Sequence, residues 1–230
     1  MELTFAPFEM TDKEGKPTGI SVEMAYALGA QLKRPVVIRN MTFDGLIPAL
    51  KTGKIDIILS SMTATEERRK SIDFSDTYIN TGLCALVGKN SPVRTAEDIN
   101  KEGVTVAVRA ATTSQLYARD VLTKTRVIVL EEEASCVASV IQGKADLYIY
   151  DQIAILQHWQ RHRETTRAIL KPIKQESWAM GIRQGNTELK DQINAFLKQY
   201  RAEGGFEKLG DKYLKEAKKA FADQGVQFVF

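Results

Sequence analysis

The sequence predicts an α/β protein made of two similar lobes, each a mostly parallel sheet flanked by helices. Apolar runs of strand length alternate with amphipathic segments of helix length along the whole chain, which is typical of parallel sheets connected by helices. Two segments also resemble each other: IPALKTGKIDIIL at 47–59 and VASVIQGKADLYI at 137–149 share an apolar helix end, Gly-Lys-x-Asp and an apolar strand. In both, the glycine suits a left-handed helix C-cap. The similarity is short, so coincidence is the alternative, but two lobes of the same winding explain it better.

Periodicity gives the elements of the first half in order. Helices are predicted at Val22–Leu32 and Phe43–Leu50, and strands at Pro35–Ile38, Ile55–Leu59 and Leu83–Val87, the last of these ended by Gly88. The polar segment 89–103 contains Pro92 and a short helix around Asp98. We interpret this segment as the start of the second lobe.

The second half continues the alternation. Strands are predicted at Val104–Val108, Arg126–Leu130 and Ala145–Tyr150, and helices at Thr113–Leu122, Ser135–Ile141 and Ile153–Arg161. A return strand at Ile173–Met180 is followed by helices at Asn186–Tyr200 and Phe206–Ala222, and Val226–Phe230 again has strand character.

Composition excludes several classes of function. The net charge is +3 and the basic residues are interleaved with acids, so nothing indicates a nucleic-acid partner. No run approaches the roughly 18 apolar residues of a membrane span. Cys84 and Cys136 are too few for a disulfide framework, and we expect both to be buried free thiols. The chain opens almost inside a loop, Ala6-Pro7-Phe8, with no strand before it. We expect either that an upstream segment has been trimmed or that another part of the chain fills its place.

Three hydroxyl side chains, Ser60, Ser61 and Thr63, directly follow the predicted strand Ile55–Leu59. In open α/β sheets, ligands gather beyond the carboxyl ends of the strands, where helix N-termini also point. We therefore expect these hydroxyls and the backbone groups beside them to face a ligand-binding crevice.

An arginine, Arg68, lies one turn into the short helix that comes next, for which Thr65 is the expected N-cap. A guanidinium group beside backbone N–H groups is a receptor for a carboxylate. The alternative is that Arg68 pairs at the surface with Glu66 or Asp73, and the local sequence favours neither reading.

The second lobe offers its own candidates. The strand 104–108 ends in Arg109, and the small residues up to Ser114 open a helix whose N-terminus suits an anion but lacks the glycines of a nucleotide-phosphate loop. Asp151 ends the strand 145–150, where it could hold an ammonium group or cap the next helix. Phe5 and Phe43 lie at loop-to-helix junctions, where they could enclose a ligand side chain or pack in the core.

Nearly the whole chain resembles the periplasmic (type II) solute-binding proteins of the polar amino-acid family, which serve ATP-binding-cassette (ABC) importers. The resemblance is carried by FAPFEM (5–10), GKPTGISVEMAYALG (15–29), FDGLIPALKTGKIDIILSSMTATEERRKSIDFSD (43–76), VAVRAATTSQLY (106–117), GKADLYIYDQ (143–152) and WAMGIRQGNTELKDQINAFL (178–197). Family members place a strand before FAPFEM that this sequence lacks; Val226–Phe230 could fill that position, as in a permuted chain.

The resemblance implies a role for each candidate residue. Arg68 matches the arginine that binds the ligand α-carboxylate, helped by Ser61 and Thr113. Asp151 matches the acid that receives the α-ammonium group, aided by Thr63 and the carbonyl of Ser61. Phe5 and Phe43 match aromatic walls around the ligand side chain, while Glu2 and Arg109 match positions that select it.

The implied architecture has lobe 1 at 1–86 and 179–230, lobe 2 at 87–178, and a two-strand hinge near 83–89 and 175–180. Both charges of a zwitterion must be matched in a dry cleft, because an unpaired buried charge costs several kcal/mol. Arg68 and Asp151 lie on different lobes, so closure is expected to be coupled to binding. Glu2 favours a ligand whose side chain carries hydrogen-bond donors, whereas Arg109 favours a neutral side chain. Glutamine and arginine are therefore equally supported as the ligand.

The predicted protein is thus an amino-acid receptor in the periplasm or outside the cell, and the sequence leaves a lipid anchor on its full-length precursor open. It is expected to be a monomer without cofactor or metal, and its partner is an ABC permease. One alternative is an enzyme, because some relatives of this fold are cyclohexadienyl dehydratases, which need a proton donor aimed at a leaving hydroxyl. Another is the ligand-binding module of a sensor. His158 and His162 are expected on a solvated helix face, without the third ligand of a metal site, and no serine or cysteine has a histidine at a nucleophile-motif spacing.

Overall fold

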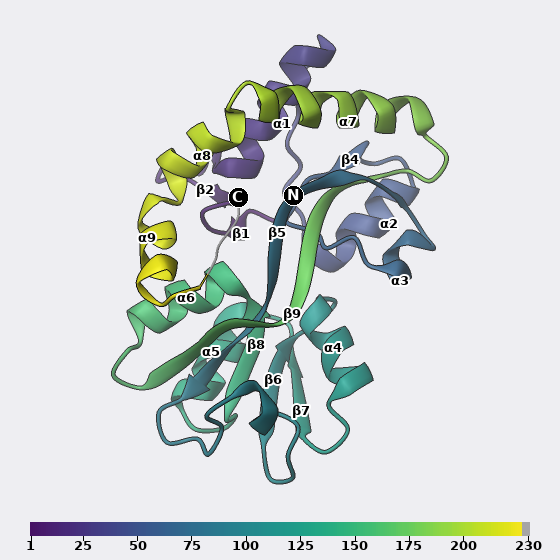
Figure 1. Ribbon diagram of the computed structural model, residues 1–230. Coiled ribbons are helices and arrows are strands. Elements are labelled where there is room, and N and C mark those ends of the chain that lie inside the picture. Colours follow the sequence, from purple (N-terminus) through teal and green to yellow (C-terminus); the bar gives the residue numbers. More distant parts are fainter. Residues whose placement is uncertain (227–230) are drawn as a thin grey trace. The chain divides into compact units, whose positions relative to one another are not determined.

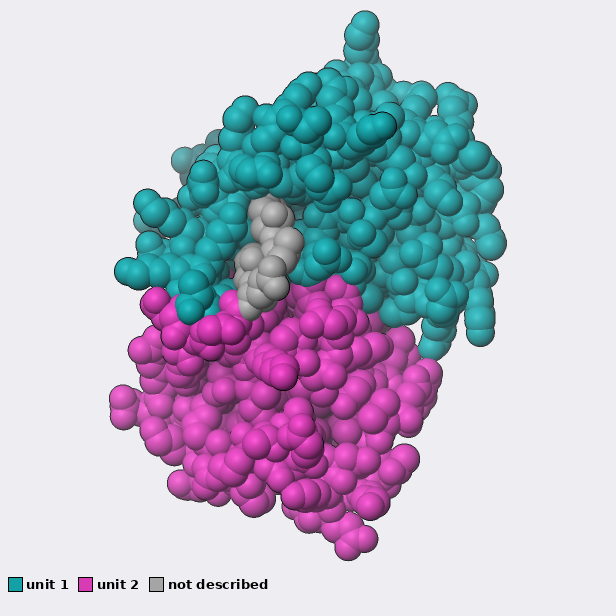
Figure 2. Space-filling model, viewed as in Figure 1, with its two compact units in different colours: residues 1–80, 177–222, 228–230 teal, residues 81–176, 223–227 magenta. Residues whose placement is uncertain are grey.

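The computed structural model describes residues 1–226 (Figure 1). The described chain divides into two compact units: Met1–Asn80 with Ser177–Ala222 form unit 1, and Thr81–Glu176 with residues 223–226 form unit 2 (Figure 2). Two long strands, β5 (Asp73–Gly88) and β9 (Thr166–Ile182), have residues in both units.

Unit 2 is built on a sheet in which each inner strand has two neighbours. β6 (Thr105–Arg109) lies between β7 (Arg126–Leu130) and β8 (Leu147–Asp151) and is parallel to both. β8 then pairs antiparallel with residues 83–87 of β5. Helices α4 (Thr113–Val121), α5 (Glu133–Ile141) and α6 (Gln152–Arg161) pack against β6 and β8. Covered faces explain why these strands are nearly continuous apolar runs, since parallel sheets are buried on both sides.

Unit 1 has less sheet and more helix. Its strands are β1 (Thr4–Phe5), β2 (Glu9–Thr11) and β3 (Pro17–Thr18), which form a small antiparallel sheet, and β4 (Ile57–Ile58), which pairs with the end of β9. Its helices are α1 (Ile20–Leu32), the 3₁₀ turn η1 (Phe43–Gly45), α2 (Leu46–Lys51), α3 (Glu66–Arg69), α7 (Thr187–Ala202), α8 (Gly205–Tyr213) and most of α9 (Lys215–Asp223). A core around Leu46, Leu50 and Phe74 joins α2 to β4 and β5.

A glycine fixes the start of α1. Gly19 has φ 116°, and a Cβ atom placed on it would lie 2.4 Å from the carbonyl oxygen of Phe8. Because only glycine tolerates both conditions, the chain can turn here and the backbone N–H of Ser21 reaches the Phe8 oxygen at 2.8 Å. This close approach brings α1 against β2.

The α/β class is confirmed, but the strand predicted at Pro35–Ile38 is wrong. The segment is irregular, Val37 is 70% exposed, and no backbone hydrogen bond joins Val36, Val37 or Ile38 to any other described residue. The strand predicted at 55–59 is reduced to β4, whose ladder among the described residues is with β9. A groove of about 600 Å³ is lined by both segments together with Met1, Leu28 and Leu32. A β-branched sequence forms a strand only where a neighbour supplies the ladder.

Other elements differ in extent. β5 begins at Asp73 rather than Leu83, and β9 at Thr166 rather than Ile173. The single helix predicted at 206–222 is two, α8 and α9, separated at Leu214. Short helices appear at Ala96–Asp98 (η2) and in α3 as predicted. Beyond Val226, the strand predicted at 226–230 lies outside the described residues. Both cysteines are free and buried as predicted, and no helix within 1–226 combines the length and apolarity needed to cross a bilayer.

Candidate functional site

The hydroxyl-rich turn that follows β4 is held by residues far away in sequence. Ser60 is 2% exposed, and its Oγ accepts a hydrogen bond from the backbone N–H of Glu2 at 3.0 Å. Ser61 has φ 48°, in the left-handed region that non-glycine residues rarely occupy. Thr63 forms an antiparallel bridge with Trp178 in β9. The turn is therefore fixed between the N-terminal segment and β9, and a strained residue such as Ser61 is characteristic of functional sites.

Arg68 is buried at this turn, with 8% exposure. Thr65 caps α3, as predicted: its Oγ1 accepts from the N–H of Arg68 at 3.2 Å. The arginine Nη1 donates to the carbonyl oxygen of Thr63 at 2.9 Å, and its guanidinium carbon lies 5.3 Å from the centre of the Phe43 ring. A carbonyl and an aromatic face thus hold the guanidinium group at the end of β4.

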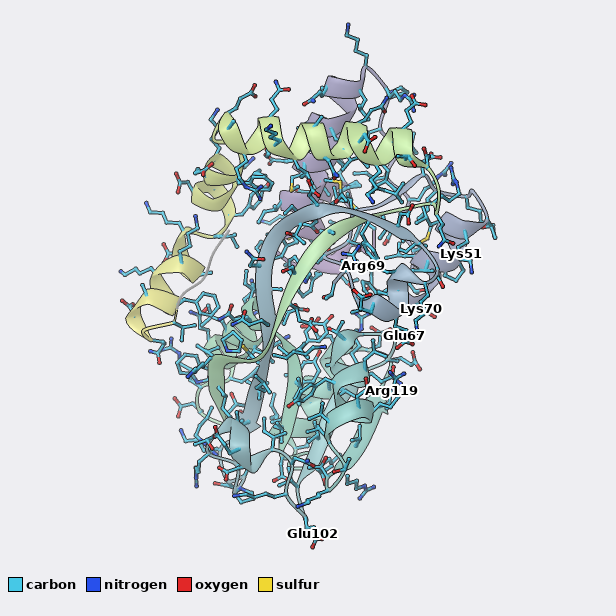
Figure 3. All side chains as sticks on the ribbon, turned by 45° about the vertical axis from the view of Figure 1, so that its right-hand side comes forward. Lys51, Glu67, Arg69, Lys70, Glu102 and Arg119 are labelled. Atoms are coloured by element: carbon cyan, nitrogen blue, oxygen red, sulfur yellow. The ribbon has the colours of Figure 1, made fainter. Side chains whose placement is uncertain are left out.

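The surface alternative for Arg68 does not fit this geometry. Glu66 lies 3.8 Å from Arg69 instead, and Asp73 accepts from the N–H of Gly185 at 2.9 Å. Glu67 and Lys70, which are labelled beside α3 in Figure 3, are exposed. Among the basic residues of α3, only Arg68 is buried.

The two aromatic residues of unit 1 that are candidates for the ligand site differ in environment. Phe5 is 7% exposed and packs with Phe8 and Trp178, at ring-centroid distances of 5.8 Å to each. Phe43 is half-buried, and its backbone N–H donates to Oε1 of Glu2 at 3.3 Å. Phe5 therefore packs among other buried aromatic side chains, whereas Phe43 lies beside Arg68. Glu2, 8% exposed, is held at the start of η1.

In unit 2, Arg109 is anchored inside its own unit. It is 8% exposed; its Nε donates to the carbonyl oxygen of Glu131 at 3.1 Å and its Nη1 to the hydroxyl of Tyr150 at 3.3 Å. Burial is the main reason that the pKa of Tyr150 is raised well above 10, so its hydroxyl keeps its proton.

Thr113, the first residue of α4, shows a contact that the sequence did not predict. Its Oγ1 donates at 2.7 Å to Oε2 of Glu176, whose side chain is 1% exposed. Lys174 lies 3.4 Å from the other carboxylate oxygen. A threonine hydroxyl has one proton to donate, so while it binds Glu176, Thr113 can serve an anion only through the helix N-terminus. Glu176 lies 63 residues away on β9, and no local pattern marked it.

Asp151 closes β8 and stands at the N-cap position of α6, yet its side chain makes no capping hydrogen bond. The residue is half-buried, and its Oδ1 is shielded from solvent. The side chain of Asp151 therefore does not cap α6. Asp151 thus lies at the carboxyl end of a strand, the region where ligands of open α/β sheets gather.

The histidine prediction needs correction. His158 does not lie on a solvated face: its side chain is 15% exposed, and its Nε2 lies 2.5 Å from Oε1 of Glu133, which ties α6 to α5. Within residues 1–226, no group of three or more His, Cys, Asp or Glu side chains could hold a metal ion.

A second acid that sequence reasoning missed is Glu9 of β2. It is 1% exposed, and its Oε2 accepts from the hydroxyl of Ser21 at 2.6 Å. Burial is the main cause that raises the pKa of Glu9 to about 8. Its neighbours include Ser61, so this acid lies directly behind the turn described above.

The candidate residues thus fall into two groups. Ser60, Ser61, Thr63, Arg68, Phe43 and Glu2 meet in unit 1, and Arg109, Thr113 and Asp151 lie at the carboxyl ends of strands or the start of a helix in unit 2. The group in unit 1 includes the buried cation of Arg68, and the group in unit 2 includes the half-buried acid Asp151.

Comparison with known proteins gives a consistent picture. Residues 1–216 match the model of the bacterial extracellular solute-binding proteins, family 3. The chain is 29% identical over 205 residues to the glutamine-binding protein of an ABC transporter from Bacillus subtilis (strain 168), covering 88% of this chain and 74% of that protein. It is 30% identical over 223 residues to the L-arginine-binding protein of Pseudomonas aeruginosa, covering 93% and 86%.

A solved structure of an ancestral amino acid-binding protein, a precursor of cyclohexadienyl dehydratase, superposes with a TM-score of 0.83 at 35% identity, covering 93% of this chain and 92% of that one. These relatives are all named as amino-acid-binding proteins, and the glutamine-binding one belongs to an ABC transporter. The match over nearly the full length shows that the chain belongs to family 3 of the bacterial extracellular solute-binding proteins.

Proposed function

We propose that this protein is an extracytoplasmic receptor that captures a free polar L-amino acid and delivers it to an ABC importer. The observation that carries the proposal is the buried guanidinium of Arg68, fixed by the Thr63 carbonyl and the Phe43 ring at the end of β4. A planar, pre-oriented guanidinium at such a position binds a carboxylate through two parallel hydrogen bonds.

The ammonium group of the same ligand is assigned to Asp151. A zwitterion leaves water only if both of its charges are matched, because one unpaired buried charge costs several kcal/mol. The N-terminus of α4 adds backbone N–H groups for the carboxylate. Since Arg68 and Asp151 belong to different units, the ligand links the two, and movement about β5 and β9 closes the receptor on it.

Glutamine and arginine are the two candidate ligands. Relatives that bind each of them are similar to this chain to nearly the same degree. Glu2 supplies a buried carboxylate beside Phe43, which favours a ligand side chain with hydrogen-bond donors. Both candidates carry such donors, and a cationic side chain gains more from the carboxylate than an amide does.

Isothermal titration calorimetry against the standard amino acids at about pH 7 tests the proposal. We expect one or a few polar amino acids to bind, and Arg68→Ala to weaken binding by roughly 30-fold or more, as expected when one partner of a buried charged pair is lost. The matched control is Arg69→Ala on the same helix, whose side chain is 40% exposed and whose loss should change the affinity less than about twofold. Absence of binding by every amino acid, or equal effects of the two substitutions, would contradict the proposed site.

The proposed setting is the periplasm or the outer cell surface, and the proposed partner is the permease of an ABC transporter, with the receptor acting as a monomer. Size-exclusion chromatography with light scattering, with and without the ligand, checks the last point. A stable dimer in both states would contradict it.

A second candidate, a dehydratase acting on cyclohexadienyl acids, is favoured by one observation. Glu176 places a buried carboxyl group 2.7 Å from the hydroxyl of Thr113, and a carboxyl group within hydrogen-bond reach of a hydroxyl has the geometry that general acid–base catalysis requires. Incubation with prephenate or arogenate, followed by ultraviolet detection of an aromatic product, distinguishes the candidates. Product formation that disappears in Glu176→Gln supports the enzyme, and no product supports the receptor.

A further inference from the structure

A carboxylate of the protein itself occupies the start of α4. Oε2 of Glu176 accepts a hydrogen bond at 2.7 Å from the hydroxyl of Thr113, the first residue of that helix. The Glu176 side chain is 1% exposed and Thr113 is 5% exposed, so the contact is shielded from solvent. Lys174 supplies the opposite charge, with its Nζ 3.4 Å from Oε1 of the same carboxylate. The positive end of α4 therefore already holds an anion.

The hydroxyls on either side of Thr113 are committed elsewhere. Thr112 donates to the carbonyl oxygen of Arg109 at 2.7 Å, and the Oγ of Ser114 lies 2.8 Å from the Oγ1 of Thr112. Because a threonine has one hydroxyl proton, and Thr112 gives it to Arg109, Ser114 is the donor in the second contact. Of the three hydroxyls at residues 112–114, that of Thr113 is thus the one that donates to a charged group.

The carboxylate of Glu176 and the α-carboxylate of an amino acid need the same proton. In the proposed site, Arg68 and the start of α4 bind the ligand carboxylate. Thr113 can donate to only one of the two anions at a time, and two carboxylates at one desolvated helix start repel each other. Binding of the ligand therefore requires the Thr113 hydroxyl to turn away from Glu176, which then keeps Lys174 as its charged partner.

We propose that Glu176 sets the affinity of the amino-acid site by competing with the α-carboxylate of the ligand for Thr113 and the positive end of α4. This inference rests on the proposed function and adds to it a residue that acts through Thr113. A competitor on the same chain is present at a fixed effective concentration, so it weakens binding at every concentration of ligand. The competition concerns the carboxylate and is therefore independent of the side chain of the ligand.

Calorimetry with glutamine and arginine at neutral pH compares wild type, Glu176→Gln and Glu102→Gln. A glutamine amide can accept from Thr113 or donate to it, so Glu176→Gln frees the Thr113 proton for the ligand and removes the competing charge. We expect a dissociation constant about tenfold lower than that of wild type, the size of one hydrogen bond to a charged group. Glu102, exposed in unit 2 (Figure 3), is the control for net charge, and its substitution should change the affinity less than about twofold.

The α-carboxamides of both amino acids separate competition from a structural role. A carboxamide has no negative charge at this end of the molecule, so Glu176→Gln should give it no comparable gain. If the contact between Thr113 and Glu176 served only to hold the start of α4, its weakening would reduce binding of every ligand. Equal or weaker binding of the amino acids by Glu176→Gln, or an equal gain for the carboxamides, would overturn the proposal.

A second variant decides the question if Glu176→Gln does not fold. Lys174 is 44% exposed, and without it Glu176 depends more strongly on Thr113. We expect Lys174→Gln to weaken binding of the amino acids about threefold, as for a half-exposed ion pair, and the exposed control Lys144→Gln to leave it unchanged. Unchanged or tighter binding by Lys174→Gln would contradict the inference. Failure of wild type to bind any amino acid would instead contradict the proposed function itself.

Discussion

The two units contain the same helix–glycine–strand sequence with two different outcomes. In unit 1, Gly53 follows the C-cap of α2 with φ 77°, and the N–H of Lys54 reaches the carbonyl of Ala49 at 3.0 Å. In unit 2, Gly143 follows the C-cap of α5 with φ 70°, and the N–H of Lys144 reaches that of Ser139 at 2.8 Å. The helix ends are equivalent, yet β8 has five residues and β4 has two.

The neighbours of the strands explain this difference. β8 lies between β5 and β6 and is bonded to both, whereas the ladder of β4 within the described chain is with β9. Likewise, Arg126–Leu130 pairs with β6 at every position, while Pro35–Ile38 borders a groove. Short-range signals thus fix a helix end, but a strand grows only as far as its partners do.

The largest expected effect comes from placing a charge at comparable β-branched positions. Val106→Asp, at a site with no exposure, should destabilise unit 2 by roughly 4 kcal/mol or more, because a carboxylate in the centre of a sheet has no partner. Val37→Asp, where the native side chain is 70% exposed, should change stability by less than about 0.5 kcal/mol. Urea unfolding followed by circular dichroism measures both, and similar losses would contradict the assigned difference between the segments.

A smaller effect is expected from adding a strand beside Pro35–Ile38 in unit 1, as β6 lies beside β7 in unit 2. Met1 already makes one parallel rung: its amino group donates to the carbonyl of Arg39 at 3.0 Å, and the N–H of Met41 donates to the carbonyl of Met1 at 3.1 Å. Fusing Val-Thr-Val-Ala-Val, the sequence of Val104–Val108, directly before Met1 should extend this ladder along the groove. We expect a gain of about 2 kcal/mol from the buried valines, net of their ordering.

The control for the fusion is Val-Thr-Pro-Ala-Val, because proline removes a ladder donor from a central strand. Hydrogen exchange at Val36, Val37 and Ile58 should slow in the first fusion and not in the second. If both fusions leave exchange and stability unchanged, the groove does not accept a strand.

The smallest effect should be the same in both units. Gly53→Ala and Gly143→Ala each force an L-residue into the left-handed region, which costs about 1 kcal/mol. Neither glycine has an atom closer than 3.8 Å to an added Cβ, so backbone conformation alone should decide the loss. Unequal losses in thermal unfolding would show that the two helix ends are not equivalent after all.

Much of the candidate site could be located from the sequence. Arg68 and its cap Thr65 are three residues apart, so a local signal marked them, and the resemblance to the family marked Asp151, Ser61 and Thr113. The acids behind them were not predictable in this way. Glu9 is 52 positions from Ser61, and Glu176 is 63 from Thr113, so only the folded chain brings each acid to its partner.

The sequence by itself determined the α/β class, the positions of the helices apart from the break at Leu214, the Thr65 cap of α3 and the two buried thiols, because spacing and capping act over a few residues. Tertiary structure decided the length of the strands, the anchoring of Arg109 within unit 2, and the burial that raises the pKa of Glu9 to about 8. Ladders, hydrogen bonds to distant carbonyls and desolvation all depend on which remote segments come together, and no local pattern contains that information.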